Sequence, residues 1–295
     1  MTDAPEPTPA APIGTAAVIA AWSGLDQMAQ LVVGGSIAAI VLTILGLPFG
    51  TWGSTDFVLL VLAAAIVALV TAAMATTSRN IGPLALLETG AATVLAVLAV
   101  WNFIAILFHL DLGRNGGIIG LLFTVALAGA AIAVLVGAVN RLGGPRALGV
   151  DDGRGAMVAS AGFVLVLVGW AANLSISYWT MAEASLSLAV LTVATVIILA
   201  SRRIESPVPV AWVGVVFGVL GAILGFGQWG DLNALGRGHV ELGPTDFLAF
   251  LVYAIGLVMV IVGGVMTALE QKPVSFAIDS AVDPVEPADR GERPE

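Results

Sequence analysis

Eight long apolar stretches restrict what this chain can fold into more than any other feature of the sequence. Each approaches the roughly 20 mainly apolar residues that an α-helix needs to cross the hydrocarbon core of a bilayer. Backbone groups in hydrocarbon must be paired within the segment, and no barrel-like alternation is present. The sequence therefore predicts an all-α, polytopic integral membrane protein. The predicted helices are 30–47, 57–77, 84–110, 118–139, 157–172, 176–200, 210–226 and 247–269.

Composition agrees with this fold class and excludes several functions. Of the 295 residues, 59% are hydrophobic and 11% are charged, with a mean hydropathy of +1.02, whereas soluble domains carry about 25% charged residues. The net charge of −9 argues against nucleic-acid binding, which requires a basic surface. The absence of cysteine excludes disulfides and thiolate metal sites. Abundant Ala, Val and Gly, with Arg in place of Lys, suggest a bacterium with a GC-rich genome.

The basic residues predict the orientation. Cytoplasmic connections of membrane proteins are enriched in Lys and Arg. Seven basic residues lie between the helices at one end of the predicted bundle or just after the last helix: Arg79, Arg141, Arg146, Arg154, Arg202, Arg203 and Lys272. Only Arg114 and Arg237 lie at the other end. We therefore expect both termini in the cytoplasm, and the protein in the bacterial cytoplasmic membrane.

Four regions follow from the composition along the chain. Residues 1–13 are rich in Pro and Ala and are expected to form a disordered cytoplasmic tail. Residues 14–28 are expected to form an amphipathic helix in the membrane interface, with Trp22 at headgroup depth. Residues 29–270 are the predicted transmembrane domain. Residues 271–295 are acidic and rich in Pro, which predicts a second disordered cytoplasmic tail.

One sequence motif occurs twice. Residues 44–57 read ILGLPFGTWGSTDF, and residues 223–230 read ILGFGQWG, followed after an insertion by PTDF at 244–247. Both copies join two apolar stretches, so the repeated unit is a hairpin of membrane helices. A duplication of four helices would place the motif between the predicted helices 157–172 and 176–200, where only faint echoes of it occur. Four tandem hairpins therefore fit the sequence better than two groups of four helices. We expect Trp52 and Trp229 to end the outgoing helices, with each indole N–H facing water.

The Thr-Asp pairs of this motif have a structural explanation and a functional one. Thr55, or Ser54 beside it, and Thr245 are good N-cap residues for the returning helices. Asp56 and Asp246 would then lie in the first turn, where the helix dipole favours a negative charge. The alternative is an ion or proton site at these carboxylates.

Polar residues within the apolar stretches form two candidate sites, because burying such residues in lipid is costly. Glu88, Asn102 and His109 are separated by fourteen and seven residues, which places them on one face of a helix. Thr180, Glu183 and Ser187 form a similar face on the predicted helix 176–200. These residues are hydrogen-bond partners between helices or carboxylates that snorkel to the interface, or they line a polar path or a ligand cavity.

The sequence gives no indication of catalysis. It contains no nucleophile elbow, phosphate-binding loop or HExxH motif, so we expect neither catalytic residues nor a cofactor. His109 and His239 lie near acidic residues at the outer end, but their spacing fits no known metal site, and we expect no bound metal. The polar loop 230–244 is the best candidate for an external contact surface.

A resemblance supports the hairpin architecture. Gly24-Leu25-Asp26-Gln27, followed by Leu45-Gly46-Leu47-Pro48-Phe49, resembles uncharacterised bacterial multi-pass membrane proteins in which a hairpin turns at a Leu-Pro-aromatic sequence. It covers about residues 22–78, and Phe49 stands where the pattern usually has Trp. The resemblance implies membrane location and hairpin architecture, and no activity.

Two functional hypotheses remain. The first is a structural or accessory scaffold subunit that associates with other membrane proteins or with itself, because small-residue-rich helices such as 126–137 allow close helix packing. The second is a transporter or channel for a small solute, ion or lipid that uses the polar faces on the predicted helices 84–110 and 176–200. An aqueous cleft lined by both faces would favour the second.

Overall fold

The computed structural model describes residues 22–49, 51–52, 54–77, 82–108, 117–144, 146, 149–150, 153–173, 180–204, 209–236 and 244–271. Within these ranges, only the backbone is described at 77, 82–83, 108, 173, 180–183, 228–236 and 244–246. The described α-helices are α2 (Gln27–Gly46), α3 (Thr55–Thr77), α4 (Gly82–Phe108), α5 (Gly117–Leu142), α6 (Arg154–Asn173), α7 (Thr180–Ala200), α8 (Ala211–Gly236) and α9 (Pro244–Glu270). Two short 3-10 turns, η1 (Leu47–Phe49) and η3 (Ser201–Arg203), follow α2 and α7.

The all-helical prediction is confirmed for the described part of the chain. Seven of these helices are long and apolar enough to cross a membrane, which makes this a multi-pass membrane protein. In the remaining helix, α8, the apolar stretch Ala211–Gly227 is shorter. Apolar side chains cover the outside as well as the interior: Leu122 and Val216 are 62% and 65% exposed. Helices that are apolar on all sides suit a lipid environment.

The helix ends follow from local sequence. Asp26 caps α2, because its Oδ1 accepts a hydrogen bond from the Ala29 N–H at 2.8 Å. Residues 27 and 28, assigned to the interfacial helix by the sequence, therefore belong to α2. Gly143, with φ of 114°, ends α5, and the Gly144 N–H donates to the Val139 carbonyl at 2.9 Å. Pro244 begins α9, where its missing N–H costs no helical hydrogen bond.

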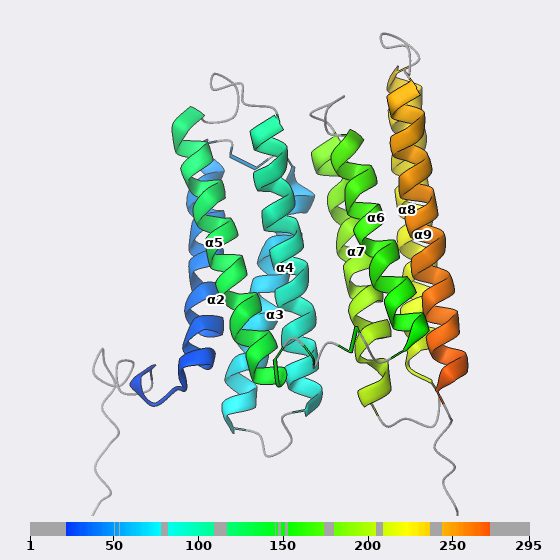
Figure 1. Ribbon diagram of the computed structural model, residues 1–295. Helices are drawn as coiled ribbons and strands as arrows, with labels where there is room; N and C mark the ends of the chain where they lie inside the picture. Colours follow the sequence, from blue (N-terminus) through cyan, green and yellow to red (C-terminus); the bar gives the residue numbers. More distant parts are fainter. Residues whose placement is uncertain are drawn as a thin grey trace, which may run out of the picture.

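The helices assemble as two groups of four (Figure 1). We call α2–α5 the first half and α6–α9 the second half. In each half the helices form a ring in which the first helix packs against the last, α2 on α5 and α6 on α9. This packing differs from the expected four hairpins, since the strongest contacts join helices that are three places apart in the chain. The two helices of each expected hairpin also contact each other, and the hairpin repeat itself stays a prediction from the sequence.

The two halves meet mainly through α4 and α7, with a smaller contact between α3 and α7. Side chains cross this boundary in both directions. Trp101 of α4 belongs to the apolar core of the second half, and Ala189 of α7 belongs to that of the first. Successive helices alternate in direction, so the described chain begins and ends at the same end of the bundle (Figure 1). We call this the basic end, because Arg141, Arg146, Arg154, Arg202 and Arg203 lie there.

Candidate functional site

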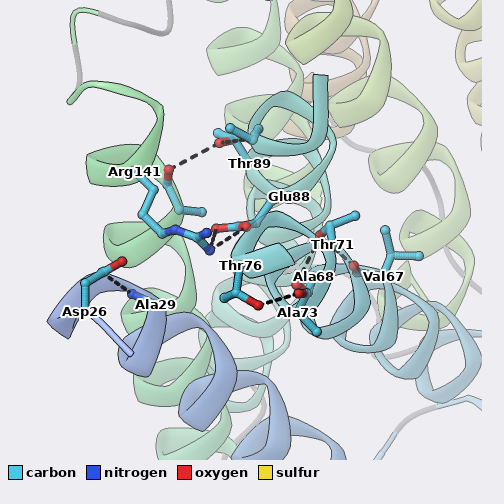
Figure 2. A network of polar contacts seen from close by, with 12 residues as sticks. Asp26, Ala29, Val67, Ala68, Thr71, Ala73, Thr76, Glu88, Thr89 and Arg141 are labelled. Atoms are coloured by element: carbon cyan, nitrogen blue, oxygen red, sulfur yellow. Dashed lines mark hydrogen bonds and ion pairs between the residues drawn. The ribbon is translucent and has the colours of Figure 1, made fainter. Parts of the chain in front are cut away.

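The strongest polar contact in the first half joins Glu88 of α4 to Arg141 in the last turn of α5 (Figure 2). Arg141 Nη1 donates to both carboxylate oxygens, at 2.9 Å to Oε1 and 2.7 Å to Oε2. The Glu88 side chain is 1% exposed and that of Arg141 is 12% exposed. Charge-assisted hydrogen bonds of this kind are about twice as strong as neutral ones. The pair therefore compensates the buried carboxylate and ties α4 to α5.

A second contact continues this link along the same two helices. The Thr89 hydroxyl donates to the Ala85 carbonyl in its own helix at 2.7 Å, and lies 3.4 Å from the Ala138 carbonyl of α5. Figure 2 shows the Glu88–Arg141 pair and Thr89 near the start of α2, where Asp26 makes its capping bond. The basic end of the first half thus contains a compact set of polar contacts between helices.

The predicted stripe on α4 continues inward from Glu88. Asn102 is 2% exposed, and Leu95, Ala92 and Ala99 along the same stripe are completely buried in the first-half core. Asn102 Nδ2 has no hydrogen-bond partner among the described residues. The third predicted member, His109, lies outside the described residues. The described part of this stripe faces the interior of the first half.

The predicted face on α7 lies in the second half. Ser187 is fully buried, and its hydroxyl donates to the Gly221 carbonyl of α8 at 3.0 Å. Thr180 and Glu183 fall in the first turn of α7, but their side chains lie outside the described part. The one described member of this face is used in a contact between helices.

The described members of the two faces therefore bond to helices of different halves. Glu88 bonds to α5 in the first half, whereas Ser187 bonds to α8 in the second. Several other buried hydroxyls, including those of Thr43, Thr124 and Thr267, donate to the carbonyl four residues earlier in their own helix. The described side chains consequently form no polar path that α4 and α7 share.

An apolar groove lies where the halves meet. It has a volume of about 480 Å³ and is lined by residues within 60–67 of α3, 86–94 of α4 and 186–200 of α7, with Ile204, Val210 and Phe217. Neither Glu88, Asn102 nor Ser187 contributes to this lining. The groove was not anticipated from the sequence, because its walls come from helices far apart in the chain.

The first copy of the repeated motif forms a turn closed by Trp52. The Leu47 N–H bonds to the Ile44 carbonyl, which leaves the Thr43 carbonyl without its helical donor. The Trp52 indole N–H supplies that donor at 2.7 Å, and its ring lies on Gly46, where a methyl group would approach within 2.7 Å. Trp52 is only 9% exposed. The expectation that this N–H faces water was wrong, because an unpaired carbonyl at the helix end is the nearer acceptor.

The capping of α3 is made by Ser54. Its hydroxyl accepts a hydrogen bond from the Phe57 N–H at 3.1 Å, so Thr55 is the first helical residue and not the cap. Asp56 lies in the first turn and is exposed, as the dipole argument requires. This geometry gives the Asp56 carboxylate a structural role at the helix start.

The second copy of the motif has a different backbone. Trp229 lies inside α8, which continues to Gly236, so the expectation that Trp229 ends the outgoing helix was wrong. The first copy contains Pro48 between Gly46 and the Trp, and the second has no proline there. Pro lacks an N–H and interrupts a helix, whereas the second copy can remain helical. The backbone of Thr245 and Asp246 lies in the first turn of α9, and their side chains are outside the described part.

The sequence did not lead us to predict the close contact between α6 and α9. Gly155, Gly162 and Gly169 of α6 recur every seven residues, as do Gly256 and Gly263 of α9. A methyl group at Gly162 would lie 2.7 Å from the Gly256 carbonyl oxygen, and one at Gly256 would lie 2.7 Å from the Gly162 oxygen. The backbones of α6 and α9 are thus in direct contact. The seven-residue glycine spacing was the available signal.

No metal centre is formed by the residues that the structure describes, among which no three His, Asp or Glu side chains cluster. His109 and His239 both lie outside those residues. Comparison of the chain with protein-family models, curated proteins and solved structures finds no match.

Proposed function

We propose that the protein crosses the bacterial cytoplasmic membrane eight times, with both termini inside. The α8 helix supports the eighth span, because its 26 residues extend about 39 Å at 1.5 Å per residue, more than the roughly 30 Å hydrocarbon core. The clustering of arginine at the end where the described chain starts and finishes supports the cytoplasmic assignment. A single cysteine introduced at Thr55 of this cysteine-free chain should react with an impermeant maleimide on intact cells, and one at Arg154 should not.

Within that membrane, the protein acts as a structural or accessory subunit that associates with other membrane proteins. One observation carries this proposal: Glu88 and Ser187 form contacts within separate halves. A transport path through both polar faces would require them to share a cleft. Their side chains instead hold the bundle together, as expected of a scaffold.

The outer face of α5 is the surface proposed for association. Some small residues of this helix are used internally, since Ala131 and Gly137 are buried against the first-half core or α2. Ala126 and Gly129 are exposed, and a Cβ added at Gly129 would meet no atom within 4 Å. Small residues let a neighbouring membrane helix approach closely. This face therefore fits a helix of a partner protein or of a second copy.

Photocrosslinking tests this role. The variant Gly129→Cys, labelled with benzophenone maleimide in native membranes, should form one dominant protein adduct, identified by mass spectrometry. The matched control is Gly227→Cys, an equally open glycine on α8. If position 129 gives no adduct and the protein purifies as a lone monomer from several mild detergents, the accessory role is wrong.

A further inference from the structure

The groove between the halves offers an apolar surface to the bilayer. Several of its lining side chains are exposed at its rim, including Leu87 at 55%, Val67 at 38% and Leu186 at 38%. Gly90 on its wall has only one neighbour near an added Cβ, Val196 Cγ1 at 3.6 Å. A hydrocarbon group entering from the lipid would find apolar contacts on three sides and no polar partner among these lining residues.

The dimensions of the groove select the kind of occupant. Its wall on α7 runs from residue 186 to residue 200, about 21 Å at 1.5 Å per residue. One leaflet contributes about 15 Å of hydrocarbon, half of the roughly 30 Å core. The groove is therefore long enough for an extended acyl chain to lie along α7.

The arginines near the groove indicate which lipid headgroup would bind there. Ile204 lines the groove and directly follows Arg202 and Arg203 of η3. The Arg203 Nη2 donates to the Arg146 backbone carbonyl at 2.8 Å, which holds the α5–α6 connection beside the end of α7. Arg146 and Arg203 are both exposed. Basic residues between membrane helices on the cytoplasmic side attract anionic lipid headgroups.

We propose that this groove binds one acyl chain of an anionic phospholipid, whose phosphate is held by the exposed Arg146 beside the end of α7. The lipid fills the junction of α3, α4 and α7, and so links the two halves where their helices leave space. This lipid site is separate from the partner surface on α5. Its test uses purified protein without any partner, so its failure and that of the accessory role are distinguishable.

Native mass spectrometry of the delipidated full chain provides the test, with phosphatidylglycerol and phosphatidylcholine of identical acyl chains added back separately. The wild-type protein should retain one phosphatidylglycerol in preference to phosphatidylcholine. Gly90→Leu places a side chain in the groove and should weaken this binding about tenfold or more, as displacement of two methylene groups from an apolar site would. Gly227→Leu is the matched control and should bind as the wild type does. Ala63→Phe, at an exposed lining position, repeats the test if Gly90→Leu folds poorly.

The headgroup contact is tested separately. Arg146→Gln should reduce phosphatidylglycerol binding about fivefold, the effect of one basic residue near anionic lipid, and leave phosphatidylcholine binding unchanged. Arg154→Gln, at the same end of the bundle but in the first turn of α6, is the control. Equal binding of the two lipids by the wild type would overturn the proposal. Unchanged lipid binding in both Gly90→Leu and Ala63→Phe would also overturn it, as would a partner helix crosslinked within the groove.

Discussion

The two halves have the same helix arrangement, but different contacts hold them. In the first half, α4 and α5 are joined by the buried Glu88–Arg141 pair, and the Trp52 indole closes the turn after α2. In the second half, α6 and α9 touch through glycines at seven-residue intervals. The ion pair there, Arg202 with Glu270, lies at the surface, with side chains 28% and 34% exposed. Both halves use close backbone approach, since Gly35 and Gly137 bring α2 and α5 together in the first half, but among the described residues only the first half adds a buried ion pair.

The comparison shows how a helix bundle is held together when its surroundings are as apolar as its core. Burial from water contributes little to association between helices in lipid, so van der Waals packing and interhelical hydrogen bonds must supply it. Glycine permits more packing contacts because it has no side chain to separate the backbones. A buried ion pair supplies strong hydrogen bonds but requires both charges to remain paired. Removal of a buried charge and crowding of a glycine contact should therefore destabilise the bundle by different mechanisms.

The largest effect is expected from Arg141→Gln. It leaves the Glu88 carboxylate buried without its cation, and breaking such a pair costs about 3–5 kcal/mol. The unfolding free energy in mixed detergent and SDS micelles, followed by circular dichroism, measures this change. The double variant Glu88→Leu with Arg141→Leu should recover most of the loss, because neither charge is then buried alone. If the double variant is no more stable than Arg141→Gln, lost packing and not the unpaired charge explains the effect.

The glycine contact of the second half is probed by Gly162→Ala. The added methyl group would meet the Gly256 carbonyl oxygen at 2.7 Å, and backbone atoms of α9 cannot move aside as a side chain can. Overpacking typically costs about 1–3 kcal/mol, and this rigid site should lie near 2–3 kcal/mol. The same micelle titration measures it. Gly218→Ala is the control, because its neighbours lie at 3.5 Å and 3.7 Å; a similar loss there would mean that helix glycines matter for another reason.

A smaller loss is expected from Trp52→Phe. The substitution keeps an aromatic ring over Gly46 but leaves the Thr43 carbonyl without its indole donor. A buried acceptor left unpaired costs about 1–3 kcal/mol, and the ring contacts that remain favour a value of about 1–2 kcal/mol. Unfolding of the variant in micelles gives the figure. A change within error would show that water or lipid headgroups replace the indole.

The sequence predicted the features that depend on neighbouring residues. The apolar stretches located the helices, and Ser54 with Asp56 marked the start of α3. The failures concern contacts between distant segments. The spacing of the polar residues predicts that Glu88 points into the bundle, but its partner Arg141 is 53 residues away, in a segment that the sequence predicts as a cytoplasmic connection. The prediction for Trp229 failed because it relied on the similarity of the two copies of the motif. The first copy contains Pro48 and turns there, whereas the second copy has no proline and continues as a helix.

The smallest effect is expected from Arg202→Gln, the counterpart of Arg141→Gln in the second half. Arg202 and Glu270 are joined at the basic end, but both remain partly exposed to solvent, so either charge can be hydrated when the other is removed. Exposed ion pairs contribute about 0.2–1 kcal/mol, and salt screens them further. The loss should therefore stay below about 1 kcal/mol and shrink as salt is raised in the micelle titration. A loss equal to that of Arg141→Gln, and independent of salt, would mean that the second half also depends on a buried ion pair. The contrast between the halves would then be wrong, because both would use the same contact at the same end of the bundle.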